Sequence, residues 1–338
     1  MKKKLSLIFT LALATLMTTG CDFLDNVMNI VQPSNKKEEG TQENNQQNLE
    51  EDQNTNTEEN NEQNTDGTDG GSTQTTVVDP VNTEDVDAYY SGVSDSLSGA
   101  ALKTKLHELI KITKSGWEYS NLFDAYRKTD VRPDGETFWD IYSDKSNYTL
   151  NDKRINSSYK KEGDSINKEH IIPQSYFNEA SPMKADVHHV LPSDGYVNNR
   201  RSAYPHGEVT GSITYTSEDG YILGSGTGNG TVFEPKDHYK GDIARIYFYF
   251  VTCYQDRLSS FKNFTPIVNN TYPSFNTTFL ELYLEWSVND PVSDKETIRN
   301  NAAYEGQHNR NPFVDRPSYA CKIWGATNTK TKQICGVH

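Results

Sequence analysis

Residues 165–175 read SINKEHIIPQS, and this stretch decides the fold because it places a charged pair inside a strand pattern. Apolar residues that stop at Pro173 are typical of a β-strand that enters the core and ends there. Neighbouring side chains on a strand point to opposite faces, so Glu169 and His170 can serve one site only where the strand ends or is distorted. The proline nearby allows this. The stretch therefore predicts a polar site at the end of a buried strand.

The segments on both sides of this strand predict helices and further strands without a βαβ rhythm. The expected helices lie at 98–116 (ended by Gly116), 120–130, 196–204, 240–259, 277–290 and 293–307, and strands or hairpins at 137–143 and 211–235. The last helix begins with a capping box of Ser293 and Glu296. This mixture predicts an α+β fold, a mixed helical domain around the polar site.

The N-terminus has the pattern of an export signal over residues 1–20. Three lysines precede an apolar run that is too short for a comfortable membrane span. The small pair Thr19-Gly20 before Cys21 resembles a bacterial lipobox, so we expect Cys21 to be lipidated and to become the mature N-terminus. The protein would then be anchored to a membrane, at the cell surface or facing the periplasm. The alternative is an ordinary cleaved signal and a secreted protein.

Residues 21–80 are acidic and of low complexity, and we expect a disordered tether there. The formal net charge of the chain is −14, but residues 21–90 hold 17 acidic side chains and only two lysines. The remainder is therefore close to neutral and can still carry a local basic groove of the kind that phosphates need. Residues 81–338 are the expected folded domain, and we expect a monomer.

The other cysteines fall into two groups. Cys321 and Cys335 lie close together near the C-terminus and could form a disulfide in an exported protein. Cys253 lies in an apolar helical run, where a buried thiol is the expectation.

Several polar residues follow the Glu169–His170 pair within some forty positions: Asp186, His188, His189, Asn198, Asn199, Arg200 and Arg201. Carboxylate and amide oxygens are hard ligands suited to Mg²⁺ or Ca²⁺, and a neutral imidazole can take a proton from water near neutral pH. Arginines can hold a phosphate through two hydrogen bonds. Together these groups are the parts needed for phosphodiester hydrolysis.

Four segments occur in an order that resembles the bacterial endonuclease I family of secreted, non-specific nucleases. They are NKEHIIPQSYF (167–177), ADVHHVLPSDGYVNNRRSAYPHGEV (185–209), KGDIARIYFY (240–249) and GQHNRNPFVDRP (306–317). The segments 89–110 and 138–143 also resemble the start of that family's domain, so the likeness covers roughly residues 88–325.

The resemblance implies a ββα-metal (His-Me finger) site that cuts DNA and/or RNA to 5′-phosphate products. By this likeness His170 matches the general base, while Glu169 and Asn198 match metal ligands. The implied metal is Mg²⁺, with Ca²⁺ or Mn²⁺ as alternatives, and it would keep open positions for water and a phosphate oxygen.

Two arginines have a role left open between phosphate binding and structural pairing. Arg201 follows the asparagine as a family arginine does, and Arg245 lies in the family-like GDIAR. In some family members a further arginine that assists the leaving group lies in a cysteine-rich insertion. Only QSYFNEASPMKA (174–185) occupies that place here, so the sequence does not identify this helper.

Other functions have weaker support. A zinc site with His188 and His189 lacks a third ligand at regular spacing, so we expect one of the two to be hydrogen-bonded beside the site and the other to be structural, with Asp186 as an orienting partner. GSGTGNG (224–230) lacks the lysine and helix of a phosphate loop, and no G-x-S-x-G supports a serine hydrolase. The alternatives that remain are an inactive nucleic-acid-binding surface protein and a nuclease restricted to RNA.

Overall fold

The computed structural model describes residues 84–338, so the predicted signal peptide, the lipidation of Cys21 and the predicted tether lie outside the described residues. The described part has an α+β fold, as predicted. Its helices are α1 (Glu84–Tyr90), α2 (Gly99–Ile110), α3 (Leu122–Thr129), α4 (Gly195–Arg201), α5 (Asp237–Cys253), α6 (Thr277–Asn289), α7 (Asp294–Gln307), α8 (Pro312–Asp315), α9 (Ser318–Trp324) and α10 (Thr329–Cys335). Its strands are β1 (Ile166–His170), β2 (Val190–Asp194), β3 (Val209–Thr216), β4 (Ile222–Gly226) and β5 (Gly230–Glu234).

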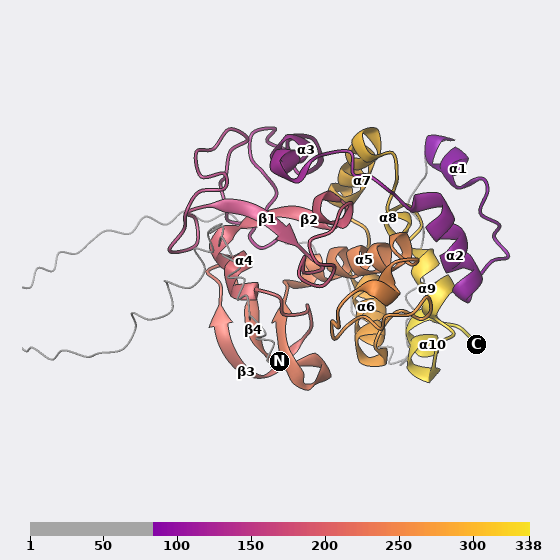
Figure 1. Cartoon of the computed structure of the whole chain (residues 1–338). Coiled ribbons are helices and arrows are strands. Elements are labelled where there is room, and N and C mark those ends of the chain that lie inside the picture. Colours follow the sequence, from indigo (N-terminus) through magenta and orange to yellow (C-terminus); the bar gives the residue numbers. More distant parts are fainter. Residues whose placement is uncertain (1–83) are drawn as a thin grey trace, which may run out of the picture. The chain divides into compact units, whose positions relative to one another are not determined.

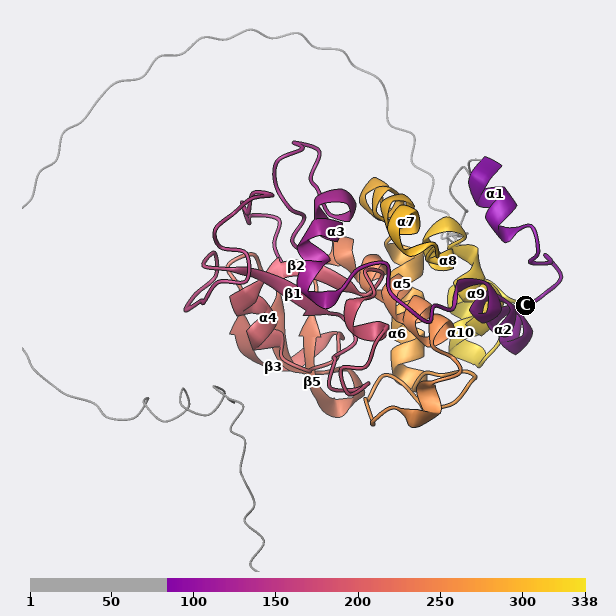
Figure 2. The ribbon, with the colours of Figure 1, turned by 45° about the horizontal axis from the view of Figure 1, so that its top comes forward.

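The strands β1 and β2 form an antiparallel pair in which Glu169 lies opposite Leu191 and His170 opposite Val190. This hairpin lies between α3 and α4 (Figures 1 and 2). Pro192 lies opposite Lys168 in β1. Proline has no N–H to donate to the strand pairing. The carbonyl oxygen of Pro192 accepts from the backbone N–H of Ile141 at 3.1 Å.

The helix α4 begins directly where β2 ends, which completes a strand–strand–helix unit. Asp194, the last residue of β2, is the N-cap of α4, and its carboxylate accepts from the backbone N–H groups of Tyr196 and Val197. The helix ends at Ser202, whose φ of 56° turns the chain away. The predicted short helix at 196–204 is therefore confirmed, and its position beside the Glu169–His170 strand is fixed by one aspartate.

The core is built around α5, which is buried along nearly its whole length. The run IYFYF within it leaves no polar face, so neighbours must cover every side, and α5 packs against α6, α2 and α8. The three-stranded antiparallel sheet β3–β4–β5 contributes Val232 and Phe233 of its edge strand β5 to the same core, and Tyr221, just before β4, joins them. The capping box of Ser293 and Glu296 is present at the start of α7, as predicted.

The predicted strand at 137–143 is wrong, because this stretch makes only isolated bridges. Asp140 turns the chain here: its carboxylate accepts from the backbone N–H groups of Tyr142 at 2.8 Å and of Asp194 at 3.0 Å. The turn ties the stretch to the end of β2. As a result Tyr142 points at Glu169.

The predicted end of the first long helix at Gly116 is also wrong, since α2 ends at Ile110. Gly116 is needed for another reason. A Cβ atom at this position would lie 2.1 Å from the carbonyl oxygen of Gly306 in α7, so the two backbones approach too closely for a side chain.

The cysteines behave as the sequence suggested. Cys321 and Cys335 form a disulfide between α9 and α10, with their Cα atoms 5.5 Å apart, and Cys253 is a buried free thiol. No helix within residues 84–338 is long and apolar enough to cross a membrane.

Candidate active site

Glu169 is a buried carboxylate held by two donors. It is 2% exposed, and its Oε1 accepts from the hydroxyl of Tyr142 at 2.7 Å and from Nη1 of Arg201 at 2.7 Å. Burial raises the pKa of Glu169 to about 7, although the neighbouring Arg201 and Tyr142 act to lower it. The backbone N–H of His170 also acts on this carboxylate. Tyr142 and Arg201 both donate to Oε1, and no side chain in the described part of the chain donates to Oε2, so this oxygen faces no competing side chain when a ligand binds.

A chain of buried polar groups lies behind this carboxylate. While Glu169 is ionised it can only accept, so the hydroxyl of Tyr142 donates to it and accepts from Nε2–H of His206 at 2.7 Å. Nδ1 of His206 then accepts from the hydroxyl of Tyr247 at 3.3 Å. Burial lowers the pKa of His206 well below its ordinary value, so this ring stays neutral. These contacts fix the direction in which the carboxylate points.

Arg201 is 1% exposed, and its donors are taken up inside the protein. Besides Glu169, Nη1 donates to the carbonyl oxygen of His170 at 2.8 Å, Nη2 to that of Ile171 at 2.6 Å, and Nε to that of Tyr204 at 2.9 Å. Of the two roles that the sequence left open, this geometry favours structural pairing. Arg201 has no face that a phosphate could reach without rearrangement.

Arg245 is buried in the same way, on α5. Its Nε and Nη2 donate to the carboxylate of Glu296, and its Nη1 donates to the carbonyl oxygen of Asp290 at 2.8 Å. Here too the geometry favours structural pairing, since the guanidinium joins α5 to the start of α7.

His170 is the last residue of β1 and is 6% exposed. Its Nε2 lies 3.0 Å from the carbonyl oxygen of Lys184, which can only accept, so Nε2 carries the proton in the neutral ring. Nδ1 is then the basic nitrogen, and it makes no hydrogen bond within residues 84–338. Burial lowers the pKa of His170 to about 3, with a further contribution from His189, so the ring is neutral at pH 7.

Glu169 and His170 occupy opposite sides of β1, as alternation along a strand requires. Glu169 faces Tyr142 and Arg201, while the His170 ring lies 5.8 Å from the ring of Tyr119, nearly parallel to it. Because the strand ends at His170, the two side chains leave from neighbouring positions at a strand end. This is the arrangement that the sequence pattern required for them to serve one site.

Asn198 lies on α4, half-buried at the edge of β1. Its Nδ2 donates to the carbonyl oxygen of Lys168 at 3.2 Å, the residue before Glu169. That bond fixes the orientation of the amide. Oδ1 has no hydrogen-bond partner among the described residues and is therefore free to accept or to bind a cation.

His188 and His189 are both buried and hydrogen-bonded to backbone carbonyl oxygens, His188 to that of Asn309 at 3.1 Å and His189 to that of Met183 at 2.7 Å. The ring of His189 lies 5.9 Å from that of His170, whereas His188 packs 4.7 Å from Tyr249. One histidine is thus beside the site and the other is structural, as the sequence suggested.

Asp186 orients this region. Its carboxylate accepts from the hydroxyls of Tyr249 and Tyr254, from Nε2 of Gln307 and from the backbone N–H of His188. It is fully buried and satisfied, as expected of an orienting partner rather than a ligand.

The residues present fit a hard divalent cation. No group of three or more His, Cys, Asp or Glu side chains that could hold a metal occurs within residues 84–338. The free oxygens of Glu169 and Asn198 form a smaller set, one carboxylate and one amide. Two protein oxygens suit Mg²⁺, which keeps several waters and binds through few protein groups.

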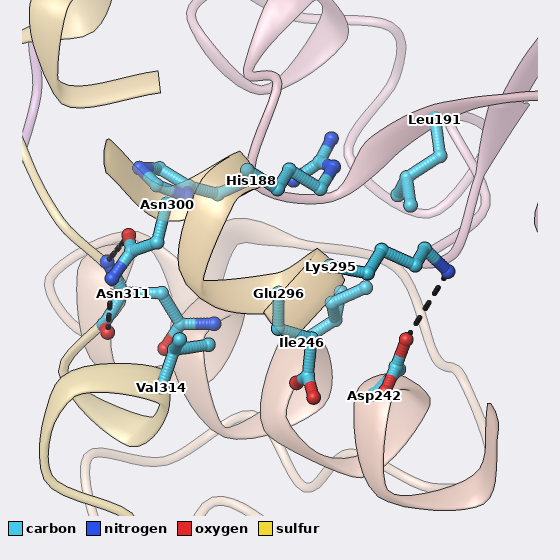
Figure 3. Close-up of a pocket in the computed structure, with 10 residues that line it drawn as sticks. His188, Leu191, Asp242, Ile246, Lys295, Glu296, Asn300, Asn311 and Val314 are labelled. Carbon is cyan, nitrogen blue, oxygen red and sulfur yellow. Dashed lines mark hydrogen bonds and ion pairs between the residues drawn. The ribbon is translucent and has the colours of Figure 1, made fainter. Parts of the chain in front are cut away.

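A separate pocket is lined by His188 and Leu191 together with residues from α5, α7 and α8 (Figure 3). Its volume is about 30 Å³, room for about one water molecule. Its charged groups are all in ion pairs, Lys295 with Asp242 at 3.2 Å, Glu296 with Arg245, and Arg299 with Asp130 at 2.8 Å. None of Glu169, His170 and Asn198 lines it, so we do not assign the site to this pocket.

Sequence analysis missed three contributors to the site: Tyr142, Tyr119 and Lys168. Tyr142 lies within FWDIYS, a segment that was noted for its family likeness and interpreted as a strand. Nothing in the sequence marked Tyr119, which reaches His170 from the turn before α3. Lys168 directly precedes the charged pair, and its position two residues before His170 was a signal that it shares a strand face with the candidate base.

Comparison with known proteins identifies the family of this chain. The Endonuclease I family profile matches residues 98–318. The chain is 32% identical over 260 residues to an extracellular ribonuclease of Bacillus amyloliquefaciens, an alignment that covers 75% of this chain and 82% of that protein. It is 31% identical over 245 residues to an extracellular ribonuclease of Bacillus subtilis (strain 168), covering 71% and 79%.

A third relative, Endonuclease-1 of Buchnera aphidicola, is 27% identical over 132 residues, which covers 39% of this chain and 46% of that protein. The names of these relatives support a nuclease, and the two extracellular ones are consistent with export or secretion. The profile match covers more than half of the chain and includes Glu169, His170 and Asn198. The chain belongs to the endonuclease I family.

Proposed function

We propose that the protein is a metal-dependent endonuclease that hydrolyses phosphodiester bonds of DNA and/or RNA without strong sequence preference, leaving 5′-phosphate products. The observation that carries the proposal is the state of His170. A neutral imidazole with its proton fixed on Nε2 by Lys184 and its Nδ1 without a partner is prepared to accept a proton. Oε2 of Glu169 at the end of β1 and Oδ1 of Asn198 on α4 would supply the place for a cation.

In this mechanism His170 takes a proton from the attacking water through Nδ1. The Nε2–H contact with the carbonyl oxygen of Lys184 holds the tautomer and also stabilises the imidazolium that forms. Burial keeps the ring neutral before the reaction, so the base is in its active form at neutral pH.

Glu169 and Asn198 would hold Mg²⁺, with Ca²⁺ or Mn²⁺ as alternatives. When bound, the ion supplies charge stabilisation for the phosphate in the transition state and for the leaving 3′ oxygen. Tyr142 and Arg201 orient the carboxylate of Glu169 and favour its ionised form against the effect of burial. Such outer partners of a ligand are often worth as much as a ligand itself.

The two faces of the strand end suit an in-line displacement. In such a reaction the attacking and leaving oxygens lie on opposite sides of phosphorus. The base lies on one face of β1, and the carboxylate on the other. A phosphate at the end of the strand would be flanked by both.

We expect the protein to recognise the phosphate backbone and not the order of the nucleobases. The candidate groups are a proton acceptor, two metal ligands and nearby cations, and none of these reads the edge of a nucleobase. The names of the two extracellular ribonucleases favour RNA as one substrate of this protein. Restriction to RNA is the second candidate. The ratio of DNA to RNA cleavage distinguishes the two.

We further propose that the protein is exported and held to a membrane by lipidation of Cys21. Support comes from the signal pattern before that cysteine and from the extracellular relatives. Metabolic labelling with a radioactive fatty acid tests this. Label that is retained by the wild type and lost in Cys21→Ser is the expected result, and an unlabelled wild type would contradict it.

Cleavage of supercoiled plasmid and of RNA by the full chain, with Mg²⁺ or with EDTA, tests the proposed function. We expect cutting of one or both with Mg²⁺, none with EDTA, and 5′-phosphate ends. Asn198→Ala should raise the Mg²⁺ concentration needed. A folded wild type that binds the nucleic acid but cuts neither with any divalent metal would contradict the proposal and favour an inactive binding protein.

A further inference from the structure

Lys168 lies on the same face of β1 as His170, two residues before it. Its backbone and its side chain both contact parts of the candidate site. The carbonyl oxygen accepts from Nδ2 of Asn198, and the ammonium lies 4.9 Å from the ring centre of Tyr119, a ring that also stacks on that of His170. Lys168 is thus connected to the candidate base and to a candidate metal ligand.

The charge of Lys168 is not neutralised by the protein. Nζ donates to Oδ1 of Asn156 at 3.1 Å and lies 5.2 Å from the ring centre of Phe123, but no carboxylate within residues 84–338 forms an ion pair with it. An ammonium has three N–H donors, and only one is used here. Contacts with aromatic faces stabilise an ammonium but leave its positive charge in place.

A second ammonium reinforces this charge. Nζ of Lys184 lies 5.0 Å from the same ring of Tyr119, and its only carboxylate partner in the described residues is Glu179 at 2.7 Å. Two lysines lie against one tyrosine, and among the described residues only Lys184 is paired with a carboxylate, which leaves a net positive patch beside His170. Two ammonium groups close together repel each other, and an anion that binds between them is attracted by both.

We propose that Lys168 binds a phosphate of the substrate, the one next to the phosphate that is attacked, with Tyr119 holding its ammonium in place. This inference rests on the proposed function, because it assigns a phosphate-binding residue to the same site. It gives to Lys168 the role that the sequence had left open for Arg201 and Arg245. Both of those arginines are buried and paired, while Lys168 is half-buried and has free donors.

Steady-state kinetics of the full chain on short fluorescent single strands of DNA and RNA test the proposal, at several salt concentrations. The variants are Lys168→Met, Lys168→Gln, which keeps a polar contact with Asn156, and Lys168→Arg, which keeps the charge. Lys332→Met is the matched control, because Lys332 is exposed on α10, at the other end of the molecule from β1 and α4 (Figure 1). Urea unfolding confirms that each variant is folded.

Both neutral variants should raise KM roughly tenfold at moderate salt, with little change in kcat, since one charge-assisted hydrogen bond is lost. The slope of log KM against log salt should fall by about 0.7, the value for one phosphate on a single strand. Lys168→Arg should retain most of the affinity. A structural role alone would change stability without changing the salt slope.

The inference is overturned if a folded neutral variant has the KM and the salt slope of Lys332→Met. Failure of the proposed function is a separate result. If the wild type binds but does not cut, fluorescence anisotropy with the same strands replaces KM. Weaker, less salt-dependent binding by Lys168→Gln would still support the phosphate contact, and unchanged binding would overturn it.

Discussion

Nη1 of Arg201 lies 2.7 Å from Oε1 of Glu169 and 2.8 Å from the carbonyl oxygen of His170, so one buried guanidinium holds both members of the charged pair. The sequence puts these two side chains next to each other, and the arginine fixes the strand end from which they diverge. The pair of Glu169 and Arg201 is almost fully buried. Its charges are therefore hardly screened by solvent.

Arg201→Met should strongly destabilise the protein, by about 3–5 kcal/mol, because it leaves a buried carboxylate without its partner. Chemical denaturation measures this. Arg200→Met is the neighbouring control: Arg200 is exposed, so its change in stability should stay within about 0.5 kcal/mol. Equal effects at the two positions would contradict the role assigned to Arg201.

Tyr142→Phe should weaken metal binding more than it weakens the fold. It removes the hydrogen bond at 2.7 Å that orients Glu169, and outer partners of a ligand are worth about 10–100-fold in metal affinity. The Mg²⁺ dependence of cleavage measures the effect. Tyr221→Phe is the control, since that buried hydroxyl donates to the carbonyl oxygen of Ile141 and does not touch Glu169. A similar Mg²⁺ dependence for both variants would count against the orienting role of Tyr142.

The strand and helix around the site could be predicted because their signals are local. The strand pattern that stops at Pro173 predicted β1, and the long apolar run in α5 predicted a buried helix. The predicted ends of elements were wrong where contacts with distant parts of the chain determine the local structure. Gly116 was expected to end a helix, but its small size is needed where the chain meets Gly306 in α7.

The partners of the site could not be predicted for a related reason. Tyr142 reaches Glu169 across 27 positions, through a turn that the carboxylate of Asp140 closes. An arginine in a sequence does not show whether it faces a phosphate or a buried carboxylate. The roles of Arg201 and Arg245 therefore depended on packing, whereas the roles of His170 and Asn198 were predicted from motif order and are a proposal here.

His189 should make stability depend on pH between about 4 and 6.5. Burial lowers the pKa of His189 in the folded protein to about 4, whereas the pKa in the unfolded chain is about 6.5. Between these pH values the unfolded chain binds a proton at His189 and the folded protein does not. The free energy of unfolding therefore falls as the pH drops below about 6.5. The full contribution is on the order of 3 kcal/mol. It is present at pH 7 and lost near pH 4.

Urea titrations of the wild type and of His189→Gln at pH 7 and pH 4.5 isolate this contribution. Raised carboxyl pKa values, such as that of Glu169, act in the opposite sense but are common to both proteins and cancel in the difference. The wild type should lose more stability on acidification than the variant. The same loss in both would contradict the assignment of a neutral, buried His189.

Replacing both Cys321 and Cys335 with Ser should lower the free energy of unfolding without affecting the site. The two residues are 14 positions apart, and closing a loop of about that length contributes roughly 3 kcal/mol. Denaturation of the double variant beside the wild type measures this. KM and kcat should remain those of the wild type, since α9 and α10 contribute no residue to the site, and a large loss of kcat in a folded variant would count against that.

The most direct test of the central claim is the single-turnover cleavage rate of His170→Ala at saturating Mg²⁺, beside the wild type and His238→Ala. His238 is an exposed histidine in the first turn of α5 and serves as the control. General-base catalysis contributes about 10²–10⁴-fold, so the rate should fall by at least 10² in His170→Ala while the control keeps the wild-type rate. A folded His170→Ala that cuts at the wild-type rate would contradict the assignment of His170 as the base.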